Sequence, residues 1–132
     1  MADARVVSNH LVEIEGAKGG TLSPMQVLKL VYISHGYRLG FNGVPLIPNR
    51  IEAWKFGPVI PDLYHSIKGY RDQPVAKTVT TGLEDFREGE ADFVTSIYNA
   101  YINLDGLQLS NLTHQDGTPW QLVYRPDVSN TV

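Results

Sequence analysis

The sequence contains no cysteine. This absence excludes a disulfide scaffold, thiolate-ligated zinc, iron–sulfur clusters and a cysteine nucleophile. A chain without disulfides is typical of a reducing compartment, and we therefore expect a cytoplasmic protein. With 132 residues, of which 42% are apolar, the chain is long enough to bury a core without such links. We expect a single domain over residues 1–132.

An excess of positive charge and long apolar runs are missing as well. Eleven Lys and Arg residues stand against 14 Asp and Glu residues, which gives a net charge of −3. A negative field does not attract phosphate backbones or anionic membranes. No apolar run approaches the roughly 18–20 residues of a membrane-spanning helix. Nucleic acid is therefore disfavoured as a partner, and we expect no membrane partner.

The local signatures of the common enzyme classes are absent too. The chain has no Gly-x-Ser-x-Gly elbow, P-loop, Gly-x-Gly-x-x-Gly turn or His-Glu-x-x-His helix. We predict from this that the protein is not an enzyme and uses no metal or other cofactor.

Four histidines are the remaining candidates for chemistry. His65 follows Asp62 by three residues, and this spacing favours a local surface hydrogen bond over a metal-ligand pair. His35 lies on the apolar stripe of a predicted helix, where we expect a half-buried imidazole bonded to a backbone carbonyl. His114 is expected to brace a turn. A metal-dependent hydrolase that combines these histidines with Asp62 or Glu52 stays open as an alternative.

Helical periodicity and capping signals predict the main elements. The strongest signal begins at Ser23, a potential N-cap followed by Pro24 at the first helical position and Gln26 at the capping-box position. This helix is expected to end at about Leu39. Apolar spacing predicts further helices over about residues 7–16, 61–69 and 90–103, and a last helical turn near residue 120.

Two segments favour short strands. Ile51–Phe56 is too short and aromatic for a helix, and Gly57-Pro58 is expected to end it. Val75–Thr81 is rich in β-branched residues and is the candidate partner of the strand at Trp54. The fold class is therefore mainly α (α+β), a compact helical domain of about five or six helices with a small two- or three-stranded β element.

Aromatic residues are abundant, with two Trp and seven Tyr. Such side chains fill cores and also anchor protein–protein interfaces. For Trp54 both interpretations stay open. Pro58 fixes its own φ and biases Gly57 toward extended geometry, so a stiff backbone is expected beside Trp54. A stiff segment loses less entropy when it docks on a partner.

Several blocks of sequence carry a resemblance to a known family. They are LSPMQVLKLVY at 22–32, SHG at 34–36, PLI at 45–47, EAWKFGPVIP at 52–61 with LY at 63–64, and LSNLTH at 109–114 with PW at 119–120. With these blocks the chain resembles the Panacea domain, the family of SocA-like antitoxins and GepA-like phage-associated proteins, over about residues 3 to 125. The AWKFGPV block is the most specific of them.

The resemblance implies an intracellular, non-enzymatic antitoxin of bacteria, phages and prophages. Such a protein neutralises a toxin encoded beside it by direct binding, and the diversity of these toxins leaves the target unnamed. Val27-Leu28 departs from the Leu-Gln pair of many relatives. A phage or prophage accessory protein that binds a host factor is the alternative function, and a second copy of the chain is an alternative partner.

The resemblance and the aromatic content together nominate a partner-binding surface. The first candidates are Trp54, Lys55, Phe56, Gly57, Pro58, Tyr64 and Trp120; the secondary candidates are Lys29, Tyr32, His35 and His114.

Overall fold

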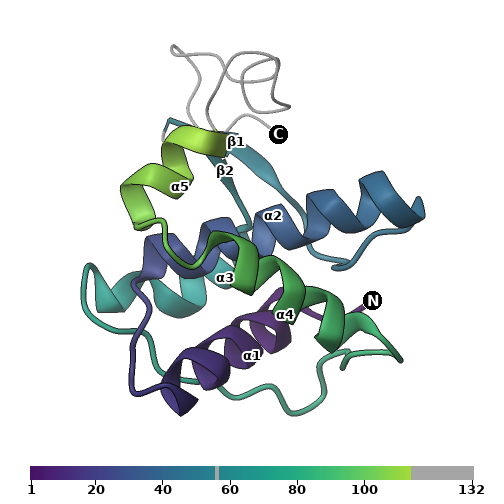
Figure 1. The fold of residues 1–132 in the computed structure, drawn as a ribbon, viewed down its shortest axis with the longest axis horizontal. Helices are drawn as coiled ribbons and strands as arrows, with labels where there is room; N and C mark the ends of the chain where they lie inside the picture. The colour runs from purple at the N-terminus through teal and green to yellow at the C-terminus, as the bar shows by residue number, and fades with distance from the viewer. Residues whose placement is uncertain (56, 114–132) are drawn as a thin grey trace.

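The computed structural model describes residues 1–55 and 57–113, which form five α-helices, a 3-10 turn and a two-stranded hairpin (Figure 1). This architecture confirms the predicted mainly helical class with a small β element. In chain order the elements are α1 (Ala4–Ala17), α2 (Pro24–Asn42), β1 (Glu52–Trp54), β2 (Gly57–Val59), α3 (Pro61–Ile67), η1 (Lys68–Tyr70), α4 (Glu90–Tyr101) and α5 (Gly106–Thr113).

Helix α2 crosses the middle of the body, with α1 and α4 on one side and the hairpin and α5 on the other (Figure 1). Buried apolar side chains from all five α-helices form one cluster around it. Burial of this apolar surface is the main source of stability for such an arrangement. The largest fully buried apolar side chains include Leu11, Leu30, Leu63, Ile67, Tyr98 and Leu109.

The start of α2 follows the sequence prediction. The Ser23 hydroxyl accepts a hydrogen bond from Gln26 N at 3.2 Å, and the Gln26 side chain accepts one from Ser23 N at 2.9 Å. These two bonds satisfy backbone donors that a helix leaves unpaired at its N-terminus. The helix passes the predicted end at Leu39 and stops at Gly43, whose left-handed φ of 70° allows its amide to cap Leu39 O.

The hairpin corrects the predicted strand pairing. Trp54 pairs with Gly57 and Ala53 with Pro58, so β2 itself is the antiparallel partner of β1. Proline is tolerated in a two-stranded sheet because an edge strand can leave one side of its backbone unpaired. Gly57 lies in β2 with a φ of 111°, a value that residues other than glycine rarely adopt.

The predicted strand at Val75–Thr81 is not formed. The backbone of this segment bonds to other elements, with Val75 N donating to Leu22 O at 2.9 Å. The side chain of Asn9 accepts from Thr78 N and donates to Thr78 O, at 2.9 and 2.8 Å. A side-chain amide thus replaces a strand partner at this position.

Helix α5 was not predicted, although the sequence carries a signal for it. Asp105 and Gln108 form a second reciprocal capping pair, with bonds of 2.8 and 2.9 Å between each backbone N–H and the other side chain. The last helical turn expected near residue 120 lies outside the described residues. Among the helices of the described ranges, none combines the length and the apolar character needed to cross a membrane.

Candidate functional site: the hairpin and the exposed end of α2

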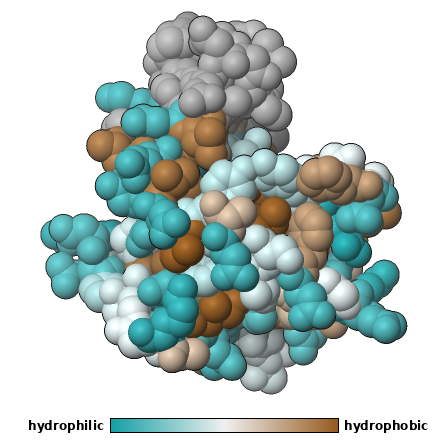
Figure 2. Space-filling model, viewed as in Figure 1, coloured by the Kyte–Doolittle hydropathy of each residue, from teal (hydrophilic) through white to brown (hydrophobic). Residues whose placement is uncertain are grey.

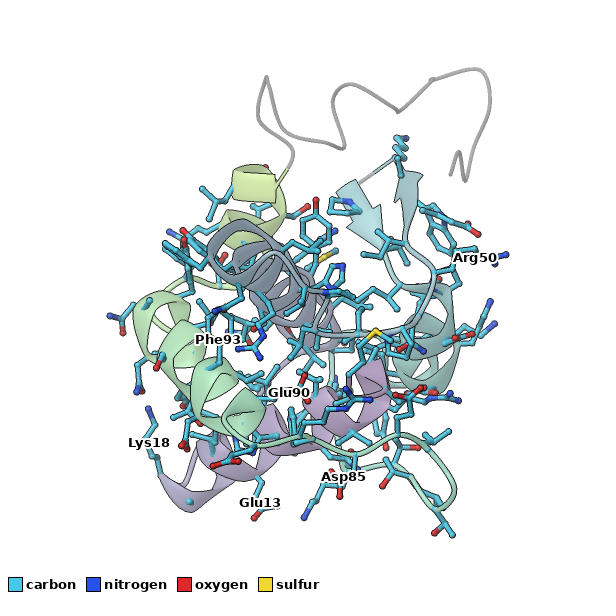
Figure 3. The ribbon with its side chains drawn as sticks, turned by 90° about the vertical axis from the view of Figure 1, so that its right-hand side faces the viewer. Glu13, Lys18, Arg50, Asp85, Glu90 and Phe93 are labelled. Carbon is cyan, nitrogen blue, oxygen red and sulfur yellow. The ribbon has the colours of Figure 1, made fainter. Side chains whose placement is uncertain are left out.

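Trp54 stands on the β1–β2 hairpin, packed against Tyr64 of α3. The two rings meet edge to face, with centroids 4.9 Å apart and an interplanar angle of 71°. Trp54 Nε1 donates to Glu52 Oε1 at 2.8 Å, and Arg50 Nη2 lies 2.8 Å from Glu52 Oε2. Figure 3 shows Arg50 on the outer side of the hairpin. These contacts fix the orientation of a half-buried indole that keeps part of its surface exposed.

Lys29 connects α2 to the hairpin. Its side chain is 1% exposed, and its Nζ donates to the backbone carbonyl of Pro58 at 2.8 Å. Burial disfavours the charged ammonium and lowers the pKa of Lys29 to about 8. Lys29 therefore lies within the fold, where it positions β2.

His35 holds the chain that leads to the hairpin. Its Nδ1 accepts hydrogen bonds from the backbone N–H groups of Leu46 and Ile47, at 3.2 and 3.3 Å. The prediction of a carbonyl partner is thus wrong, and the ring is buried where half-burial was expected. Because Nδ1 accepts, the neutral ring carries its proton on Nε2. Burial lowers the pKa of His35 and favours this neutral form.

The other nominated residues differ in exposure. Lys55 is exposed at the end of the hairpin, whereas Tyr32 and Tyr64 are half-buried and Gly57 and Pro58 are buried. The remaining three, Phe56, His114 and Trp120, lie outside the described residues.

Asp62 and His65, two residues of the alternative metal site, make other contacts in the structure. Asp62 Oδ2 accepts a hydrogen bond from Asn49 Nδ2 at 2.9 Å in place of the contact expected with His65. His65 is exposed, with its ring edge-on to Tyr64. Within residues 1–55 and 57–113, no three His, Asp or Glu side chains are grouped so that they could hold a metal ion.

A second aromatic group, not anticipated from the sequence, lies at the C-terminal end of α2. Tyr37 and Phe41 stack with centroids 5.6 Å apart, and the Tyr37 hydroxyl is hydrogen-bonded to that of Tyr101 on α4. Burial, together with Tyr37, raises the pKa of Tyr101 to about 12, so its hydroxyl stays protonated at neutral pH. The four-residue spacing of Tyr37 and Phe41 could have predicted their contact, since residues four apart share a helix face.

Comparisons with known proteins agree with the resemblance noted in the sequence. A family model described as "Antitoxin SocA-like, Panacea domain" matches residues 27–121. Antitoxin SocA of Caulobacter vibrioides (strain NA1000 / CB15N) is 30% identical over 135 aligned residues, which cover 92% of this chain and 70% of that protein. No solved structure matches the chain.

Proposed function

Since this chain belongs to the SocA-like antitoxin family, marked by the Panacea domain, we propose that it binds a toxin encoded by a neighbouring gene and neutralises it by that contact. The observation that carries the proposal is the family match over residues 27–121, which includes the hairpin, α3 and all but the first three residues of α2. In this proposal a single cytoplasmic domain acts by binding alone, without a chemical step.

We assign the contact to a hairpin face made of Trp54, Lys55 and Tyr64. Trp54 and Tyr64 are large aromatic side chains that already hold each other in one orientation. Little side-chain entropy remains to be lost when such a pair is covered, which favours its use as an anchor. Lys55 adds an exposed cation beside them. Phe56, His114 and Trp120 remain predicted partner-binding residues.

Buried residues support the hairpin face without needing to touch the toxin. Lys29 holds the carbonyl of Pro58, and His35 holds the amides of Leu46 and Ile47. Fixed supports of this kind keep a binding site in one geometry. We therefore treat Lys29 and His35 as positioning residues for the hairpin.

Co-expression with the neighbouring open reading frame tests the proposal. The wild-type chain is expected to restore growth to cells that produce the neighbouring protein, and Trp54→Ala is expected to lose this protection while staying soluble. Val79→Ala, at an exposed site outside the hairpin, is the control and should protect fully. The proposal fails if the neighbouring protein is harmless alone, or if it stays lethal when the wild-type chain is abundant.

A charge variant separates binding from folding at the same face. Trp54 is half-buried, so its truncation can also destabilise the fold. Lys55→Glu reverses the charge of an exposed side chain and is expected to weaken protection, with Lys68→Glu as its match at another exposed lysine and with the unfolding temperature of both variants measured. Equal protection by Lys55→Glu and wild type, together with unfolding of Trp54→Ala, would assign the hairpin to packing.

A further inference from the structure

Tyr37, Arg38 and Phe41 on the last two turns of α2, with the half-buried Tyr101 of α4, form an aromatic patch, here called the α2 tip patch. This end of α2 extends beyond α4 at the right of Figure 1, and Figure 2 shows hydrophobic side chains gathered over it. Phe41 is 75% exposed and Tyr37 36% exposed. Exposed large apolar side chains that lie together are one mark of a binding surface.

Arg38 gives the α2 tip patch its charge. The guanidinium carbon lies 5.5 Å from the centroid of the Phe93 ring, and Figure 3 shows Phe93 on α4 beside α2. Arg38 Nη1 reaches Asn42 Oδ1 at 3.4 Å, while Arg38 Nε is buried without an acceptor. Residues 36–43 contain no Asp or Glu. In the described part of the chain, no carboxylate lies within ion-pair distance of Arg38.

The surroundings of Arg38 indicate what the patch lacks. Because Nε is buried, a partner cannot supply its missing acceptor. The guanidinium as a whole is half-buried, and a cation beside aromatic rings attracts a carboxylate strongly once water is excluded. Tyr and Arg are also the side chains that dominate binding energy at interfaces. The matching surface therefore combines an apolar side chain with an acidic one.

We propose that the α2 tip patch is a second docking surface for the toxin and that it takes a segment in which an apolar side chain lies beside an Asp or Glu carboxylate. This inference rests on the proposed function, because the toxin is its occupant. The apolar side chain packs on Phe41 and Tyr37, and the carboxylate pairs with Arg38. The hairpin face and the α2 tip patch then contact the same partner at two places.

Titration of the purified chain with the purified protein of the neighbouring gene tests this surface. Phe41→Ser and Arg38→Gln are each expected to raise the dissociation constant about tenfold or more, as for interface anchors. Arg38→Gln should lose more affinity in low salt than in high salt, because salt screens the ion pair it removes. Phe41 is exposed, so Phe41→Ser should unfold at the same temperature as wild type. The unfolding temperature of Arg38→Gln is measured beside its affinity, because Arg38 also lies over the Phe93 ring.

Leu39→Ser is the matched control. Leu39 is 43% exposed on the same turns of α2 but points away from the face that carries 37, 38 and 41. It should bind the neighbouring protein as wild type does. A tenfold loss in Leu39→Ser equal to that in Phe41→Ser would contradict a specific patch.

The remaining outcomes separate this inference from the proposed function. If wild type fails to bind the neighbouring protein, both are wrong. If Trp54→Ala loses affinity while Phe41→Ser and Arg38→Gln bind as wild type does, only the α2 tip patch is refuted. If sedimentation shows a wild-type dimer that Phe41→Ser dissociates without affecting toxin affinity, the patch is an interface between two copies and the inference is overturned.

Discussion

The two parts of α2, Pro24–His35 and Gly36–Asn42, both carry apolar side chains but have opposite surroundings. Every buried residue of the helix lies between Pro24 and His35, and the capping box fixes its first turn. From Gly36 to Asn42 the helix carries Tyr37, Leu39 and Phe41, all exposed. One half is therefore committed to the fold, while the other presents apolar side chains to solvent. The comparison teaches that apolar content alone does not place a residue in a core.

Basic side chains also have different roles in these two parts of α2. Lys29 and Arg38 are both cations on α2, nine positions apart. Lys29 is buried and donates to a backbone carbonyl, which makes it part of the scaffold. Arg38 is half-buried and lies over an aromatic ring at the exposed end of the helix. A test of the account must therefore separate losses of stability from losses of binding.

The largest expected contrast is between two leucines of this helix. Leu30→Ala removes a fully buried side chain and should lower the free energy of unfolding by about 2–5 kcal/mol. Leu39→Ala alters an exposed one and should change it by about 0.5 kcal/mol or less. Urea denaturation of both variants checks this difference. Losses of equal size would show that the two halves of α2 are packed alike.

Lys29 should make stability depend on alkaline pH. Burial lowers its pKa from 10.5 to about 8, so between these values the unfolded chain holds a proton that the folded chain has released. The free energy of unfolding then rises with pH, by about 2 kcal/mol between roughly pH 8 and 9.5. Lys29→Met should lack this rise. A parallel pH profile in both proteins would mean that Lys29 is not desolvated.

The capping box at the start of α2 predicts a smaller effect. Ser23→Ala should lower the free energy of unfolding by about 1 kcal/mol, because the amide of Gln26 loses its acceptor. Gln26→Ala should also destabilise, and the double variant should lose less than the sum because the two bonds are reciprocal. Ser96→Ala, on the exposed face of α4, is the control. Strict additivity in urea unfolding would contradict a coupled cap.

The smallest expected effect concerns His35 and acid. Its pKa is lowered by burial, so the unfolded chain takes up the proton first as the pH falls. The stabilisation is complete above the ordinary histidine pKa of about 6.5 and is lost as the pH falls through the lower folded value. His35→Asn keeps an acceptor for the Leu46 and Ile47 amides but does not titrate. Thermal unfolding between about pH 7 and 5 should therefore change less in this variant than in wild type.

Local chemistry explains what the sequence predicted well. The start of α2 follows from Ser23, Pro24 and Gln26 alone, because a capping box involves only neighbouring residues. The helical class follows from apolar spacing in the same way. Asp105 and Gln108 form an equivalent cap at the start of α5, so this helix also has a local signal in the sequence.

Non-local contacts account for what could not be predicted. The segment at Val75–Thr81 has strand-forming composition, but Leu22 and Asn9 occupy its backbone groups from distant parts of the chain. His35 likewise binds amides eleven and twelve residues ahead. At the candidate site, Trp54 and Tyr64 were nominated from the sequence, and their contact with a partner stays a prediction. The exposure of Phe41 depends on how far α4 extends along α2, which no local pattern contains.

Hydrogen–deuterium exchange of the chain, with and without the purified protein of the neighbouring gene, tests the central claim most directly. The account predicts slower exchange on binding at two places, the β1–β2 hairpin and residues 36–43 of α2. Exchange over residues 27–35 should stay as slow as in the free chain, since that half is already buried. Unchanged exchange at both the hairpin and residues 36–43, in a sample where a complex has formed, would contradict it.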